Sequence, residues 1–284
     1  MAKQDDGGPL SKIDIEDEDI HWHTDLDYAQ YLQLDRLLTS QLPLTAEHDE
    51  ILFIVIHQAT ELWLKVCLHE LRGAIACLQR DRLRPAFKML ARMARIQDQL
   101  KQSWDILSTL TPFDYLKFRD HLGRASGFQS VQYRLLEFTI GTKNASLIEV
   151  HEQSSEAYKI LEAALHTPSL YDETLLLLSR RGFDLPKEVT ERDWAEAYQP
   201  HEAVEAAWLT VYRDVDSHWD LYELAEKLVD LEQQFQAWRF AHVKTVERII
   251  GQKRGTGGSS GVAYLTKVLE LRFFPELWSV RTRM

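Results

Sequence analysis

The sequence predicts an all-helical fold, a helical bundle with a small helical subdomain. Apolar residues recur every three to four positions along almost the whole chain, which is the period of an amphipathic helix. No stretch alternates at a period of two for long, as a half-exposed strand would. Residues that commonly begin or end helices separate the periodic segments. The clearest case is Thr111-Pro112, where proline suits the first turn of a helix.

The periodic segments divide the chain into a tail and one large helical domain. Residues 1–20 contain the run IDIEDEDI and too little apolar surface to offset the cost of ordering, so we expect a mobile acidic tail followed by a domain at 21–284. Residues 145–215 are more acidic and aromatic, and we expect a small subdomain there. In chain order, the expected helices are 27–40, 48–78, 83–108, 111–122, 130–140, 154–164, 169–181, 201–214, 220–250 and 261–271.

Capping residues support several of these boundaries. Thr45 precedes the second helix, and His48 and Asp49 lie at its start. Thr109 lies in the break between the third and fourth helices. Gly141 and Asn144 follow the fifth helix and are expected to close it.

Composition narrows the class of protein. The 284 residues carry 33 Lys and Arg against 44 Asp and Glu, a net charge of −11, which argues against a nucleic-acid or anionic-membrane partner. Cys67 and Cys77 fall on one expected helix, roughly 15 Å apart, too far to pair, since a disulfide needs Cα atoms within about 7 Å. No apolar leader is visible, and the apolar run 51–56 is too short to span a bilayer. We therefore expect a cytoplasmic protein with reduced thiols.

His242 is the first candidate for a metal ligand. It continues an apolar seam along the expected helix 220–250, which runs from Leu221 through Phe235 and Trp238 with spacings of three and four. One interpretation is a buried core histidine with a single backbone partner. The other is a haem ligand, because a neutral imidazole in an apolar wall is what five-coordinate haem iron uses.

His57 has a similar setting in the segment ILFIVIHQATELWLK. Phe53, His57 and Leu64 share one face of a strongly apolar helix. A core histidine is again the alternative. Two such histidines on separate long helices favour a two-sided iron pocket.

Tyr115 and Arg119 form a third candidate pair, one helical turn apart and followed by a turn through Gly123 and Gly127. An arginine next to a tyrosine is often only a surface pair. However, a planar guanidinium is the natural partner for a substrate carboxylate.

The segment GQKRGTGGSSG, residues 251–261, is rich in glycine. It lacks the G-x-x-x-x-G-K-[ST] order of a phosphate-binding loop and follows a helix, so a mobile lid is the better interpretation.

The sequence gives little support for other kinds of metal site. The chain has no H-E-x-x-H, C-x-x-C or C-x-x-C-H motif, and its single E-x-x-H lies in the acidic tail.

Taken together, these segments resemble the tryptophan 2,3-dioxygenase family. The similarity is carried by DYAQYLQLDRLL, HDEILFIVIHQATELWLK, TPFDYLKFRDHLGRASGFQS, FQAWRFAHVKTV and KRGTGGSSGVAYL followed by FFPELW, in the family's order. It runs from residue 23 to residue 278. The resemblance implies a helical haem dioxygenase fold and a homotetramer with one b-type haem per chain. It also implies the reaction of L-tryptophan with O₂ to N-formylkynurenine, the first step of the kynurenine pathway.

The resemblance further implies roles for individual residues. His242 would be the proximal iron ligand, His57 would lie on the distal side of the haem, and Phe53 would line the indole pocket. Arg119 would bind the substrate carboxylate, with Tyr115 beside it. Thr256 would lie at the charged end of the substrate, and Trp104 and Ser126 would lie near the haem. Three further residues would line the pocket of a neighbouring subunit, as they do in the family: Tyr28, Tyr31 and Leu32.

Two other classes of function stay open on the sequence. A haem- or tryptophan-binding sensor without turnover would keep His242 but would not need Arg119, Tyr115 and Thr256 together. A helical interaction scaffold would bury its histidines for packing and would bind no haem. The indoleamine-type dioxygenases share the chemistry, but their sequence pattern is less evident here.

Overall fold

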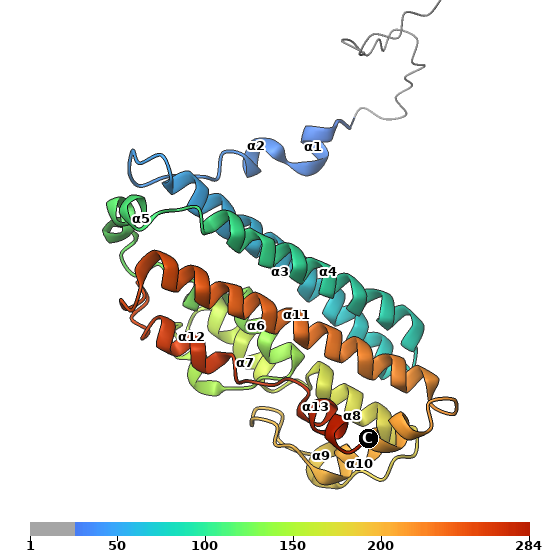
Figure 1. Ribbon diagram of the computed structural model, residues 1–284. Coiled ribbons are helices and arrows are strands. Elements are labelled where there is room, and N and C mark those ends of the chain that lie inside the picture. The colour runs from blue at the N-terminus through green and yellow to red at the C-terminus, as the bar shows by residue number, and fades with distance from the viewer. Residues whose placement is uncertain (1–25) are drawn as a thin grey trace, which may run out of the picture. The chain divides into compact units, whose positions relative to one another are not determined.

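The computed structural model describes residues 26–284 and confirms the all-helical prediction, because this range contains helices and no strand (Figure 1). The predicted acidic tail at 1–20 lies outside the described residues. The chain separates into two compact units that divide between Leu42 and Pro43. The first unit is described over residues 26–42 and the second over 43–284.

The first unit holds two short helices, α1 (Tyr28–Leu32) and α2 (Leu34–Leu37). The prediction of one continuous helix at 27–40 was therefore wrong. The break is at Gln33, whose φ of 53° is left-handed and cannot continue a right-handed helix. Its side-chain amide donates to the Gln30 carbonyl at 2.7 Å and thereby closes the end of α1.

Three long helices form the frame of the second unit. They are α3 (Glu50–Gln79), α4 (Leu83–Leu107) and α11 (Trp219–Ile250), and α4 packs against both of the others (Figure 1). Their bounds agree with the predicted segments within two residues at each end. The apolar stripe of each helix is buried in a shared core, where Leu71, Leu90 and Leu228 are almost completely inaccessible to solvent.

Shorter helices pack around this frame. The predicted cap is present at Thr111, whose hydroxyl accepts from the backbone N–H of Asp114 and whose neighbour Pro112 opens the helix. Two short helices, α9 (Lys187–Thr190) and α13 (Pro275–Ser279), were not predicted, because four or five residues are too few to show a helical period. The remaining helices are α5 (Pro112–Arg119), α6 (Val131–Ile140), α7 (Glu156–Leu165), α8 (Leu170–Arg180), α9 (Lys187–Thr190), α10 (Glu202–Arg213), α12 (Val262–Val268) and α13 (Pro275–Ser279), with 3₁₀ turns at Asp120–Leu122, Gly127–Gln129, Ala145–Ile148 and Val280–Thr282.

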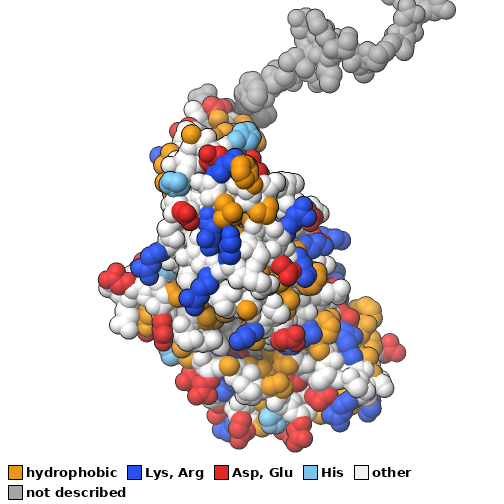
Figure 2. All heavy atoms as spheres, turned by 60° about the vertical axis from the view of Figure 1, so that its left-hand side comes forward, with side chains coloured by type: hydrophobic (Ala, Val, Ile, Leu, Met, Phe, Trp, Pro, Cys, Tyr) orange, Lys and Arg blue, Asp and Glu red, His pale blue; other side chains and the backbone are white. Residues whose placement is uncertain are grey.

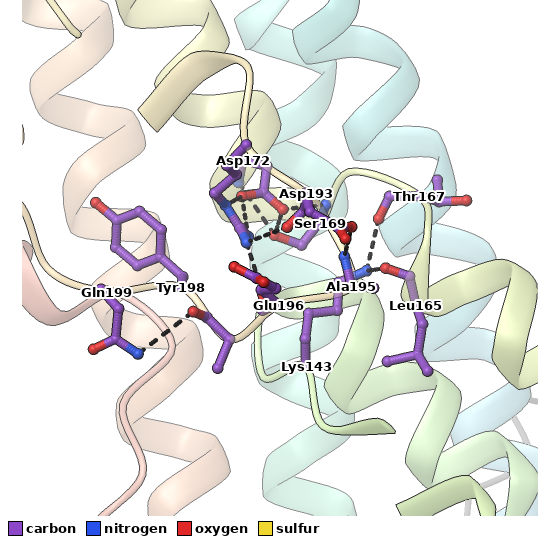
Figure 3. Close-up of polar contacts among 12 residues, drawn as sticks. Lys143, Leu165, Thr167, Ser169, Asp172, Asp193, Ala195, Glu196, Tyr198 and Gln199 are labelled. Atoms are coloured by element: carbon purple, nitrogen blue, oxygen red, sulfur yellow. Dashed lines mark hydrogen bonds and ion pairs between the residues drawn. The ribbon is translucent and has the colours of Figure 1, made fainter. Parts of the chain in front are cut away.

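Residues 145–215 contribute to the same core as the long helices through buried side chains such as Leu175 and Trp208. Polar contacts fix the turn that leads into α8 (Figure 3). There the Lys143 ammonium donates to carbonyl oxygens at the end of α7, including that of Thr167 at 2.6 Å. The Arg192 guanidinium pairs with Asp172 at 2.7 Å. A separate small subdomain in this region stays a prediction.

Within residues 26–284, α3 is the one helix that is long and apolar enough to cross a membrane by length and composition. It is also the helix that packs against α4, α6 and α8 in the second unit.

Candidate active site

A cavity of about 670 Å³ lies in the second unit among α3, α4, α6, α11 and α12. Its lining is mostly apolar, and its volume is within the range of about 300–1,000 Å³ that is usual for small-molecule sites. Segments far apart in the sequence meet here. The predicted site residues that line it are Phe53, His57, Trp104, Tyr115, Ser126, His242 and Thr256.

His242 projects from α11 between two tryptophans. The indole of Trp104 stacks on its imidazole, with ring centroids 4.4 Å apart and planes at 10°, and the centroid of Trp238 is 5.8 Å away. Burial among these rings lowers the pKa of His242 to about 4, and the nearby His57 acts in the same direction. The imidazole is therefore neutral at physiological pH and has a lone pair for a metal ion. The Nε1 of Trp104 is buried and has no hydrogen-bond partner among residues 26–284.

His57 lies on α3 and borders the same cavity. Its Nδ1 is 2.7 Å from the Phe53 carbonyl oxygen. Because a carbonyl can only accept, Nδ1 carries the proton, and Nε2 is the acceptor nitrogen of the neutral ring. Burial lowers the pKa of His57, against an opposing effect of the same hydrogen bond and of Glu61. The ring is thus fixed in one tautomer and stays uncharged.

Aromatic rings build the wall next to His57. The Phe53 ring centroid is 4.2 Å from that of His57 and 5.8 Å from that of Tyr115, and Phe118 packs against both Phe53 and Tyr115. Burial raises the pKa of Tyr115, although the adjacent Arg119 guanidinium opposes the shift, so the phenol is neutral. This wall offers flat apolar surface and one hydroxyl.

Arg119 lies one turn after Tyr115 and does not itself line the cavity. One terminal nitrogen, Nη2, donates to the carbonyl oxygen of Arg254 in the glycine-rich segment at 2.7 Å. Its Nε is buried without a partner among the described residues. Arg119 therefore contacts the glycine-rich segment through Nη2, while its Nε–H donor has no partner among the described residues.

The glycine-rich segment, residues 251–261, also contacts the turn that follows α5. Thr256 donates its hydroxyl proton to the Ala125 carbonyl at 2.6 Å. Gly257 approaches Ser126 so closely that a Cβ on it would lie 2.7 Å from the serine Cβ. A lid role for this segment stays a prediction, but the close approach explains why glycine is needed at 257.

The sequence did not single out a group of charged residues in the cavity wall. Arg134 and Glu137 on α6 line the cavity and form a buried ion pair with each other. Glu137 also pairs with Arg239 on α11, through an Nη2–Oε1 distance of 2.6 Å. One feature of the sequence could have revealed this group. Arg134 and Glu137 lie on a predicted helix whose other residues, such as Leu136, are mostly apolar, so a charged pair on it is expected to be buried with them.

Tyr28, Tyr31 and Leu32 lie on α1 in the first unit. All three are exposed there, the two tyrosines to 75% and 73%. Their role in the pocket of a neighbouring subunit stays a prediction.

The cavity wall suits a metal ion that is bound mainly by an organic cofactor and needs few ligands from the protein. Among residues 26–284 no group of three or more His, Cys, Asp or Glu side chains is placed to hold a metal ion. The neutral imidazole of His242 is nevertheless available in an apolar wall, and that of His57 borders the same cavity. This donor set fits a haem iron, because the porphyrin supplies four nitrogens and the protein needs to supply one.

Comparisons with known proteins agree with this arrangement. The sequence pattern described as tryptophan 2,3-dioxygenase matches residues 18–284. The chain is 60% identical over 258 residues to a tryptophan 2,3-dioxygenase of Erythrobacter litoralis, covering 91% of this chain and 98% of that protein. It is 57% identical over 266 residues to one from Bacillus cereus, covering 92% and 95%. It is 54% identical to one from Ralstonia pickettii, covering 94% and 96%. The chain therefore belongs to the tryptophan 2,3-dioxygenase family.

Proposed function

We propose that this protein inserts both atoms of O₂ across the C2–C3 bond of the indole of L-tryptophan and releases N-formyl-L-kynurenine, using one b-type haem per chain. The observation that carries the proposal is the placement of two neutral imidazoles, His57 on α3 and His242 on α11, at one apolar cavity. The family assignment supports the same reaction. It would be the first step of the kynurenine pathway.

His242 would hold the haem iron. Its neutral ring, its place in an apolar wall and its stacking on Trp104 fit a proximal ligand whose orientation is fixed by packing. Ser126 and Trp104 would lie against the same group, since both line the cavity. When bound, the haem supplies the activation of O₂, and the protein supplies orientation and a dry site.

The substrate would lie against the aromatic wall. Phe53 and Tyr115 provide flat surface for the indole, and the Arg119 guanidinium provides a forked donor for the carboxylate. His57 would accept a hydrogen bond from the indole N–H through Nε2, because its Nδ1–H is held by the Phe53 carbonyl. An indole N–H is far too weakly acidic for imidazole to deprotonate fully, so His57 orients the ring rather than acting as an obligatory base.

Thr256 would help to bind the charged end of tryptophan and to exclude water. The glycine-rich segment that carries it is joined to α5 by the Arg119–Arg254 contact and to the following turn by the Thr256–Ala125 contact. Closing a loop of this kind over a site shields the bound substrate from solvent.

We further infer a homotetramer in which the N-terminal segment completes the pocket of a neighbouring subunit. No residue of α1 or α2 is buried, although Tyr28, Tyr31 and Leu37 are large hydrophobic residues. In the second unit, the face that carries α5 mixes exposed hydrophobic side chains, Phe113 among them, with lysines and arginines (Figure 2). Apolar residues on both surfaces favour contact with further copies of the chain. The exposed large apolar residues of α3 are Ile51, Val55, Leu62, Trp63 and Val66.

We place the enzyme in the cytoplasm. Cys67 and Cys77 are free thiols in the structure, as expected in a reducing compartment. Burial raises the pKa of Cys67 to about 12, which makes it unreactive.

One experiment separates the enzyme from a sensor. The purified protein is supplied with haem, reduced without oxygen, mixed with L-tryptophan and then exposed to air. We expect a Soret band and repeated turnover to N-formylkynurenine. A Soret band with tryptophan binding but without product would indicate a sensor, and no Soret band would indicate a scaffold.

A further inference from the structure

Three charged side chains are buried together at one wall of the cavity. Arg134 and Glu137 on α6 and Arg239 on α11 are only 4%, 2% and 3% exposed. One carboxylate oxygen of Glu137 accepts from Arg134, and the other accepts from Arg239 at 2.6 Å. Arg134 and Glu137 both line the cavity. The cluster is thus part of the cavity wall.

The charges in this cluster do not cancel. Two guanidinium groups and one carboxylate leave a net charge of +1. Tyr133 adds no negative charge, because burial and Glu137 raise its pKa well above the ordinary value. The only other carboxylate that lines the cavity among the described residues is Glu61, which already accepts from Ser130 at 2.6 Å and Gln132 at 2.8 Å. A buried cation without a counter-charge is costly, so the cavity is suited to an anionic group.

The unused hydrogen-bonding capacity belongs to Arg134. Arg239 uses three nitrogens, donating to Tyr133, Val268 and Glu137. Arg134 donates to Glu137 through Nη1, while its Nε is buried and has no partner within residues 26–284. A guanidinium has five N–H donors in a planar fork, which matches the two oxygens of a carboxylate.

Aromatic contacts place Arg134 with the His242 wall. Its neighbour Tyr133 has its ring centroid 5.3 Å from that of Trp238, and Trp238 is 5.8 Å from His242. Arg119, in contrast, is next to Tyr115, which contacts Phe53 on the other wall. Arg134 therefore lies in the wall that carries His242, whereas Arg119 lies outside the cavity lining, next to the Tyr115 wall.

We propose that Arg134 binds a propionate carboxylate of the haem, and that Glu137 and Arg239 are positioning residues that hold its guanidinium. The inference rests on the proposed function, because a b-type haem brings two ionised propionates to an otherwise apolar site. A carboxylate of tryptophan has the same chemistry, so the test must distinguish the two sources.

The test measures how fast the holoenzyme loses haem to an excess of apomyoglobin. We compare ordinary haem with its dimethyl ester, whose propionates carry no charge, in the wild type and in Arg134→Gln. In the wild type the ester should leave roughly 10-fold faster, the scale on which groups that support a metal site act. In Arg134→Gln haem should leave faster than in the wild type, and its advantage over the ester should shrink several-fold. Arg134→Lys should restore part of the difference, because it keeps the charge but not the fork.

Arg192→Gln is the matched control. It breaks another arginine–carboxylate pair, with the buried Asp172, and neither residue of that pair lines the cavity. It should leave the preference for haem over the ester unchanged even if it lowers the melting temperature.

Two results would overturn the proposal. One is that Arg134→Gln keeps the full preference of the wild type for haem over the ester. The other is that Arg134→Gln retains haem normally but binds tryptophan more weakly, which would assign the guanidinium to the substrate carboxylate. A wild type that binds no haem would instead refute the proposed function itself.

Discussion

The indole of Trp104 on α4 lies parallel to the imidazole of His242 on α11, with centroids 4.4 Å apart. This contact joins the two long helices whose packing forms the centre of the second unit. It fixes the plane of the imidazole that is proposed to bind the iron. The orientation of His242 is therefore determined by the packing of the bundle.

The first prediction concerns His242. The variant His242→Ala should lose haem or bind it loosely, because the neutral imidazole is the iron ligand that this wall offers. The Soret absorbance per protein, measured after purification with haem, checks this. The control is His166→Ala, which removes an exposed histidine at the end of α7 and should keep full haem content. A native ferric spectrum with full haem in His242→Ala would refute the ligand assignment.

The second prediction concerns the role of His57. The variant His57→Ser should keep its haem and turn over tryptophan with reduced kcat/KM, because the ring orients the indole and is not an obligatory base. Stopped-flow tryptophan binding and steady-state rates measure the two effects separately. Complete loss of turnover, with haem content and tryptophan binding intact, would instead assign His57 an essential proton transfer.

The third prediction is the pH dependence that follows from His57. Burial lowers its pKa, so the neutral ring persists below its ordinary pKa of about 6.5. Protonation would remove the Nε2 acceptor, and kcat/KM should therefore fall only when the pH drops below that value. The same acid limb should be absent from the profile of His57→Ser. An acid limb at or above pH ~6.5 in the wild type would contradict the lowered pKa.

The fourth prediction concerns Arg119 and substrate choice. Arg119→Lys should weaken kcat/KM for tryptophan by roughly 2–4 kcal/mol, because lysine replaces a forked contact with a point contact to the carboxylate. Tryptamine lacks the carboxylate, so it should be a poor substrate of the wild type and lose little more in the variant. Equal losses for both substrates would mean that Arg119 supports the fold or the loop through Arg254.

The fifth prediction concerns the glycine-rich segment. Gly257→Ala should raise KM for tryptophan about 10-fold at unchanged haem content, because its Cβ would lie 2.7 Å from that of Ser126 and prevent docking. Gly127→Ala is the control, since a Cβ there meets nothing within 4 Å. Adding Ser126→Gly to Gly257→Ala removes the clash. If that double variant shows no recovery relative to Ser126→Gly alone, the close approach does not govern binding.

The parts of the fold that were predicted are those with a long apolar period. The seam of α11 aligned His242 with buried residues such as Trp238, and the structure has it half-buried at the cavity. The caps at Thr111 and Gly141 set boundaries that the structure repeats. The helix break at Gln33 could not be predicted, because the left-handed backbone conformation of this residue does not change the spacing of apolar residues around it.

The site divides in the same way. Residues on one helix face, such as Phe53 and His57, could be grouped from their spacing, since the helix itself brings them together. Arg134 could not be grouped with Arg239, because only the packing of α6 on the rest of the bundle makes them share Glu137. Contacts between distant segments depend on tertiary packing, which local patterns do not encode.

The most direct measurement of the central claim is the fate of labelled oxygen. The reduced holoenzyme is mixed with L-tryptophan and isotopically labelled O₂ in unlabelled water, and the product is analysed by mass spectrometry after a single turnover. The dioxygenase reaction predicts N-formylkynurenine that carries both oxygen atoms of one O₂ molecule. Product with one labelled oxygen or none, or tryptophan left unchanged by a holoenzyme with full haem content, would contradict it.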